Sequence, residues 1–146
     1  MNSSINEKLL NKALKLLSYR PRSVFEIKFR LKKLTPSVKE INTVITKLLD
    51  EDLLNDQKFA DWWVDQRVTH RPKGNIALKS ELFQKGIDRD IIDSVLLDSD
   101  QEQALAKKLL NSRKITIKPK AYQYLRARGF SSSSILSAID ELAFKE

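Results

Sequence analysis

Apolar residues recur along the chain at spacings of three and four, and the same set of positions returns twice. Residues 20–45 align without a gap with residues 71–96, and these align in turn with residues 114–139. The shared apolar positions are Ile27, Leu78 and Ala121; Leu31, Leu82 and Leu125; Ile41, Ile92 and Ile135; Val44, Val95 and Ala138; Ile45, Leu96 and Ile139. Because such spacings line one face of an α-helix, the pattern predicts a helical unit that occurs three times.

The helix breaks recur at the same places. One shared position holds Thr35, Gly86 and Gly129. Glycine suits the left-handed residue that ends a helix, whereas Thr35 precedes a proline. Two residues further on, each segment has a residue that favours the N-cap: Ser37, Asp88 and Ser131. Each aligned segment therefore predicts a helix, a stop, a cap and a second helix, and Ser23–Glu26 and Ser37–Glu40 fit the capping-box spacing.

A further helix precedes each aligned segment. The first has an apolar stripe formed by Leu9, Leu10, Ala13, Leu16 and Leu17. The second is capped by Asn55 or Asp56 and carries Phe59, Trp63 and Val64. In the third, Ala106, Leu109 and Leu110 correspond to Ala13, Leu16 and Leu17. The sequence thus predicts an all-α, elongated array of three tandem three-helix repeats, with boundaries at residues 1–54, 55–99 and 100–146.

Positive charge is concentrated around the second helix of each predicted repeat. The chain has a net charge of +8, but residues 19–33 carry +5, residues 67–85 carry +4 and residues 107–128 carry +8. One repeat-equivalent position is basic in all three units: Arg20, Arg71 and Lys114. A cation that recurs once per unit predicts a stripe suited to a phosphate backbone or to the acidic wall of a protein filament. The alternative is an ordinary solvated lysine-rich face.

The candidate contact residues come from these three basic segments. They are Arg20, Arg22, Lys28, Lys32, Arg67, Arg71, Lys73, Lys79, Arg113, Lys114, Lys118, Lys120, Arg126 and Arg128. Aromatic residues among them are candidates for stacking on unpaired bases: Tyr19, Phe25, Phe29, Phe83, Tyr122 and Tyr124. Phe25 and Phe29, four residues apart, are expected in the core instead. Of the adjacent pair Trp62 and Trp63, we expect Trp63 to point inward and Trp62 to be a contact.

No residue pattern in the chain predicts catalysis or a cofactor. The sequence lacks a Walker-type glycine loop, a Gly-x-Gly-x-x-Gly motif, paired metal-ligand spacings and cysteine. His70 is the only histidine and has no carboxylate partner nearby in sequence. No apolar run exceeds three residues, so no membrane helix is expected, and no secretory signal is visible. We therefore expect a cytoplasmic protein that is not an enzyme and binds no metal or cofactor.

Two motifs resemble those of the RecX family of bacterial recombination regulators. Residues 53–60, Leu-Leu-Asn-Asp-Gln-Lys-Phe-Ala, are followed by Trp63, Val64 and Arg67, which is similar to that family's principal signature. The second motif consists of Gly74, Leu78, Glu81, Leu82, Lys85, Gly86 and Ile87. The resemblance extends over essentially the whole chain. Asp52 departs from the family's usual glycine, and Asn75-Ile76 replaces a common proline and basic residue.

The resemblance implies a curved array that binds the RecA filament on single-stranded DNA. It further implies inhibition of the recombinase, ATPase and coprotease activities of RecA, and hence modulation of DNA repair and of the SOS response. Weak direct contact with DNA is an additional expectation, and the protein is expected to be a monomer. Two alternatives stay open at this point: a free-standing DNA-binding helical module that acts without RecA, and an adaptor for some other partner.

Overall fold

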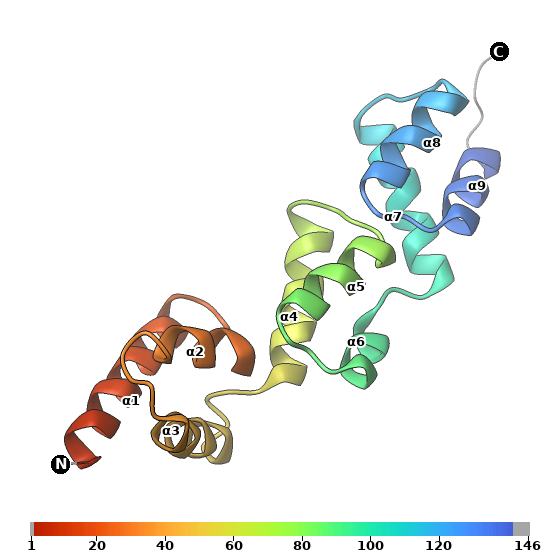
Figure 1. Cartoon of the computed structure of the whole chain (residues 1–146). Helices are drawn as coiled ribbons and strands as arrows, with labels where there is room; N and C mark the ends of the chain where they lie inside the picture. Colours follow the sequence, from red (N-terminus) through yellow and green to blue (C-terminus); the bar gives the residue numbers. More distant parts are fainter. Residues whose placement is uncertain (1, 142–146) are drawn as a thin grey trace.

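The computed structural model describes residues 2–141, and within this range every regular element is an α-helix. The helices are α1 (Asn2–Tyr19), α2 (Val24–Leu31), α3 (Val38–Asp50), α4 (Asp56–Thr69), α5 (Asn75–Gln84), α6 (Arg89–Val95), α7 (Ser99–Ser112), α8 (Lys118–Ala127) and α9 (Ser132–Glu141). They form three groups of three along an elongated molecule, whose two ends carry the two chain termini (Figure 1). The predicted all-α repeat array is confirmed. We refer to α1–α3, α4–α6 and α7–α9 as the first, second and third units, and the residue boundaries of the repeats stay a proposal.

Helix starts follow the predicted capping residues in part. Ser23 and Glu26 form a complete capping box at the start of α2. The Ser37 side chain accepts from the backbone N–H of Glu40, the serine half of the box predicted there. Asp88 is the N-cap residue of α6, but its side chain does not accept a hydrogen bond from the backbone of that helix. Ser131, the predicted cap of the last helix, directly precedes α9, and its hydroxyl donates to the Glu102 carboxylate.

Two of the three predicted helix stops coincide with left-handed backbone residues. Gly86 ends the turn after α5 with φ of 74°, and Gly129 follows α8 with φ of 83°. This conformation costs little for glycine and is unfavourable for residues with a Cβ atom. The two glycines therefore set the directions of α6 and α9.

Each unit has its own buried core. In the first unit the buried residues are Leu9, Ala13, Leu16, Ile27, Leu31, Ile41, Val44, Ile45, Leu48 and Leu54. The second unit buries Phe59, Ala60, Val64, Leu78, Leu82, Ile87 and Ile92. The third buries Leu105, Ala106, Leu109, Leu110, Ala121, Leu125, Phe130, Ile135, Ala138 and Ile139. Val68 and Leu97 pack against both the second and the third cores, so apolar contact links these two units.

Successive units are joined by the same kind of contact, which we call the first and the second joint. In the first joint, the backbone N–H of Val24 donates to Asp56 Oδ1 at 2.8 Å. In the second, the backbone N–H of Asn75 donates to Glu102 Oε2 at 2.6 Å. Val24 and Asn75 are repeat-equivalent first residues of α2 and α5. Each joint thus binds the start of a second helix to a carboxylate on the first helix of the next unit.

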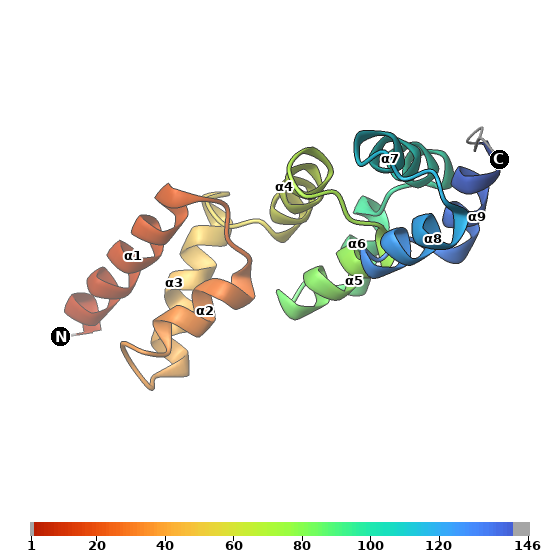
Figure 2. The same ribbon diagram turned by 90° about the horizontal axis from the view of Figure 1, so that it is seen from above.

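The glycine turns complete both joints. A Cβ atom at Gly86 would lie 2.4 Å from Phe25 Cβ, and one at Gly129 would lie 2.3 Å from Ala77 Cβ. In the second joint, the backbone N–H of Ile76 also donates to the Gly129 carbonyl at 2.9 Å. Both joints combine the start of a second helix, a carboxylate on the next first helix and a glycine turn, and the second helices α2, α5 and α8 follow one another in a row (Figure 2). The first helices α1, α4 and α7 form a second row beside it (Figure 2).

Candidate functional site

Most of the predicted contact residues are exposed and lie on or beside the row of second helices. The exposed ones are Lys32, Arg71, Lys79, Arg113, Lys114, Lys118, Lys120 and Arg126. Lys32 follows the end of α2, Lys79 lies on α5, and Lys120 lies on α8. The row therefore presents at least one exposed cation from every unit.

The other predicted contacts are engaged within the molecule. Arg20 pairs with Glu26 at 2.5 Å, and its side chain is 28% exposed. Arg67 and Lys73 both pair with Glu81, at 2.9 Å and 3.7 Å. Lys28 is half-buried. The remaining two predicted contacts are Arg22, which donates to the Leu16 carbonyl, and Arg128, which lies over the Tyr124 ring.

The predicted stripe of Arg20, Arg71 and Lys114 is therefore not uniform. Arg71 and Lys114 are exposed, whereas Arg20 belongs to a bridge between the first two units. In this bridge, Glu26 accepts from Arg20 and also from Lys85 Nζ of the second unit, at 3.3 Å. Arg20 departs from the predicted stripe because the carboxylate of Glu26 binds it, together with Lys85, at the joint.

The two carboxylates of the first joint have opposite pKa shifts. Burial raises the pKa of Glu26, but hydrogen bonds from Arg20 and Ser23 and the charges of Arg20 and Lys85 outweigh burial and lower it overall. Burial also raises the pKa of Asp56, and there the hydrogen bond from Val24 does not reverse the shift. The ionised form is thus favoured at Glu26 and disfavoured at Asp56. Glu26 is accordingly the charged centre of the bridge.

The tryptophan pair lies against the same bridge. Trp62 and Trp63 are both half-buried, so the predicted contrast between an outward and an inward tryptophan is wrong. The Arg20 guanidinium lies 5.8 Å from the Trp62 ring centroid, and Lys85 Nζ lies 5.4 Å from that of Trp63. Trp63 Nε1 also donates to Glu81 at 3.0 Å. Arg20 of the first unit covers one ring, and Glu81 and Lys85 of the second unit contact the other, which is why neither ring is fully outward.

Phe25 and Phe29 were expected in the core, and this prediction is wrong. Their side chains are 51% and 55% exposed, because Ile27 and Leu31 occupy the buried face of α2. The two rings stack on each other with centroids 6.5 Å apart. Phe83 on α5 is 74% exposed as well. The second helices therefore present aromatic rings among their cations.

A cleft of about 330 Å³ opens at the first joint, and we call it the joint cleft. It is lined by Leu16, Arg20, Arg22, Phe25, Glu26, Phe29, Arg30, Gln84 and Lys85. Burial, the charge of Arg20 and the charge of Arg30 lower the pKa of Arg22, against an opposing effect of Glu26. The positive charges in this cleft therefore repel one another. Sequence reasoning missed Arg30 and Lys85, although both lie within the basic segments that it identified.

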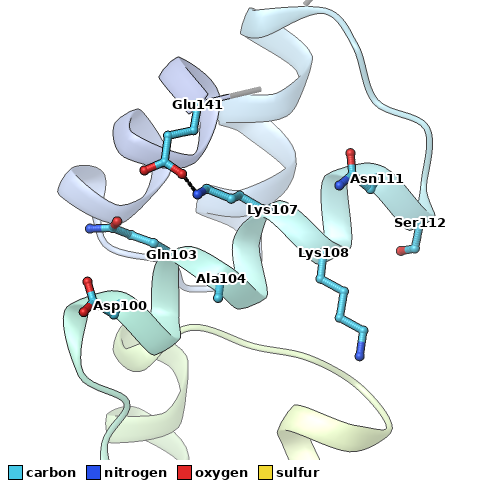
Figure 3. A pocket seen from close by; sticks show the side chains of 8 residues that line it. All are labelled: Asp100, Gln103, Ala104, Lys107, Lys108, Asn111, Ser112 and Glu141. Carbon is cyan, nitrogen blue, oxygen red and sulfur yellow. Dashed lines mark ion pairs between the residues drawn. The ribbon is translucent and has the colours of Figure 1, made fainter. Parts of the chain in front are cut away.

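A second, more open hollow runs along α7 and shows mixed charge. Lys107 pairs there with Glu141, while the Lys108 side chain extends away from that pair (Figure 3). Within residues 2–141, no group of three or more histidine, cysteine, aspartate or glutamate side chains is arranged to hold a metal ion. The same part of the chain contains no helix long and apolar enough to cross a membrane. The joint cleft and the row of second helices, in contrast, carry an excess of positive charge.

Comparison with known sequences identifies the family of this chain. Residues 10–48 match the model of the first three-helix domain of RecX, and residues 55–96 match the second. The regulatory protein RecX of Chlorobium phaeobacteroides is 33% identical, over 97% of this chain and 98% of that protein. RecX of Bacillus subtilis is 37% identical over 95% of this chain, which spans 56% of that longer protein.

Solved structures agree with the sequence comparison. The crystal structure of RecX from Lactobacillus salivarius superposes with a TM-score of 0.80 and 32% identity, and the match covers 96% of this chain and 97% of that one. A second crystal structure of a regulatory protein RecX gives a TM-score of 0.79 and 27% identity, over 96% and 74% of the two chains. Both domain models, a full-length relative and the shared fold therefore lead to one conclusion: this chain belongs to the RecX family of regulatory proteins.

Proposed function

We propose that this protein binds the RecA filament on single-stranded DNA and inhibits the recombinase, ATPase and coprotease activities of RecA. The observation that carries the proposal is the row of second helices, which presents exposed cations from all three units along an elongated molecule. Membership of a family of regulatory proteins supports a regulatory role. The protein acts in this proposal as a monomer and without catalysis or a cofactor, and it thereby modulates DNA repair and the SOS response.

The proposed contact residues are the exposed cations of the row. They are Lys32, Arg71, Lys79, Arg113, Lys114, Lys118, Lys120 and Arg126. A filament repeats its acidic groups and phosphates along its length, so an elongated ligand can engage several of them together. Each contact adds a modest electrostatic attraction, and their combination provides affinity that falls as salt concentration rises.

Inhibition of RecA is the expected result of adding this protein to preformed filaments. At amounts of the chain below those of RecA, DNA-dependent ATP hydrolysis should fall, because a bound array blocks filament growth or promotes disassembly. The measurement is the rate of phosphate release by RecA on circular single-stranded DNA during titration with the chain. An unchanged rate at equimolar chain would contradict the proposal.

The second candidate is a DNA-binding module that acts without RecA. The aromatic rings and cations of the joint cleft favour it, because stacking and electrostatic attraction together bind unpaired strands. This candidate requires tight binding to bare DNA with a steep dependence on salt. Weak binding to bare DNA together with strong inhibition of RecA filaments would reject it.

A further inference from the structure

We propose that the joint cleft binds an unpaired nucleotide of single-stranded DNA, with the base on the Phe25–Phe29 pair and the phosphate on Arg22 and Arg30. This inference deepens the proposed function by naming the DNA contact that the protein makes within the filament. Its test does not require RecA, so the two proposals can fail separately.

The aromatic pair provides the surface for the base. Phe25 and Phe29 are about half exposed and lie on one face of α2, with an angle of 24° between their rings. Exposed phenylalanine rings side by side leave apolar area in water that a planar partner would cover. Nucleobases are planar and stack on aromatic rings with little dependence on their identity. A base in the cleft would therefore bury the open face of the pair.

The cations of the cleft provide the site for the phosphate. Four basic residues and one carboxylate line it: Arg20, Arg22, Arg30, Lys85 and Glu26. Glu26 already accepts from Arg20 and Lys85 across the joint. Arg22 and Arg30 add positive charge to the cleft, and the single carboxylate of Glu26 offsets the total only in part. Because burial and the neighbouring arginines disfavour the charged form of Arg22, an incoming anion would relieve this repulsion.

The surface continues from the joint cleft onto α4. A smaller cleft there is lined by Trp62, Trp63, Gln66, Arg67, His70 and Arg71. Arg20 and Lys85, which line the joint cleft, also lie over the two tryptophan rings. A strand that leaves the joint cleft would therefore meet a second group of aromatic rings and cations. An acidic protein segment would use the cations alone, whereas aromatic rings on both sides of the bridge favour nucleobases.

The variant Phe29→Leu tests the base contact. We choose Phe29 because Phe25 packs against Gly86 in the first joint, and leucine retains apolar volume and helix propensity. The probes are a fluorescein-labelled oligothymidylate and an abasic oligonucleotide with the same number of phosphates. Phe29→Leu should weaken binding of the oligothymidylate by about fivefold or more and change binding of the abasic strand by less than about twofold.

Leu136→Ala is the control, because Leu136 is an exposed apolar residue on α9 that lies outside both the joint cleft and the row of second helices. It should leave the affinity for both oligonucleotides unchanged. The double variant Arg22→Gln, Arg30→Gln should weaken binding of both, and the slope of log affinity against log salt should become less steep by about 0.7, the value for one phosphate contact on a single strand. Circular dichroism should show the same helix content in all variants.

Two results would overturn the inference. One is an unchanged affinity of Phe29→Leu for the oligothymidylate, and the other is an equal loss for the oligothymidylate and the abasic strand. The effect of the wild-type protein on ATP hydrolysis by RecA is read separately. Inhibition of RecA by a protein whose DNA binding does not depend on bases would reject the joint cleft and leave the proposed function intact. Base-dependent binding without inhibition of RecA would reject the proposed function and leave the joint cleft as a nucleotide site.

Discussion

Replacement of Glu102 by alanine is expected to lower the free energy of unfolding by about 2–6 kcal/mol and to open the second joint. The Glu102 side chain is 2% exposed, and its carboxylate accepts from the Asn75 backbone N–H and from the Ser131 hydroxyl. Alanine leaves both partly buried donors without this acceptor, and each such donor costs about 1–3 kcal/mol. Urea unfolding followed by circular dichroism measures the stability. Hydrogen exchange of the Asn75 amide, expected to become faster, reports on the joint itself.

Asp100→Ala is the matched control for this variant. Asp100 is an exposed acidic residue in the first turn of the same helix, α7. Its removal loses only a favourable interaction with the helix dipole, about 0.3–1 kcal/mol. A Glu102→Ala protein as stable as Asp100→Ala, with unchanged protection of the Asn75 amide, would show that the carboxylate does not hold the second joint together.

The second large effect is expected for Gly74→Ala, because α5 approaches the third unit so closely there. A Cβ atom at Gly74 would lie 2.4 Å from Phe130 Cα, 2.6 Å from the Gly129 carbonyl oxygen and 2.6 Å from Phe130 N. All three atoms belong to the backbone, which cannot rotate away as a side chain does. The expected loss of stability is about 1–3 kcal/mol. Faster exchange of the Ile76 amide, which donates to Gly129, should accompany it.

The backbone of Gly74 makes this variant a test of the joint alone. Its φ of −84° and ψ of 177° suit any residue, so alanine introduces no local strain. Ser23 occupies the equivalent position in the first unit, and Ser23→Ala is therefore the comparison. That change removes the cap of α2, with a loss of about 1 kcal/mol, but should leave the first joint closed. A Gly74→Ala protein with normal stability and unchanged Ile76 exchange would contradict the packing described here.

The repeat could be predicted from the sequence because its determinants are local. Apolar spacing depends on the pitch of the helix, and Gly86 and Gly129 end their helices through their own backbone conformation. The row of second helices follows once each unit has the same three elements in the same order. For the same reason, the concentration of cations beside the second helices could be recognised from the order of residues alone.

The joints could not be predicted in this way. Glu102 is hydrophilic and would be placed on the surface by any periodicity argument, yet backbone and hydroxyl donors of two units meet at its carboxylate. Arg20 aligns with exposed cations in the other repeats, but only in the first joint do Glu26 and Trp62 lie within its reach. Phe25 and Phe29 have helical spacing without being buried, because Ile27 and Leu31 already fill the inner face of α2.

The most direct test of the proposed contact face is a binding measurement. Labelled protein with one charge reversed in each of its three units is titrated with RecA filaments on single-stranded DNA. The test variant changes the exposed lysines 32, 79 and 120, at α2, α5 and α8, to glutamate. The control changes the exposed lysines 15, 39 and 108, on α1, α3 and α7, and alters the net charge equally. The filament affinity of the test variant should fall by about tenfold or more, while that of the control stays near the wild-type value. Equal weakening by both variants, or full affinity of a folded test variant, would contradict the account.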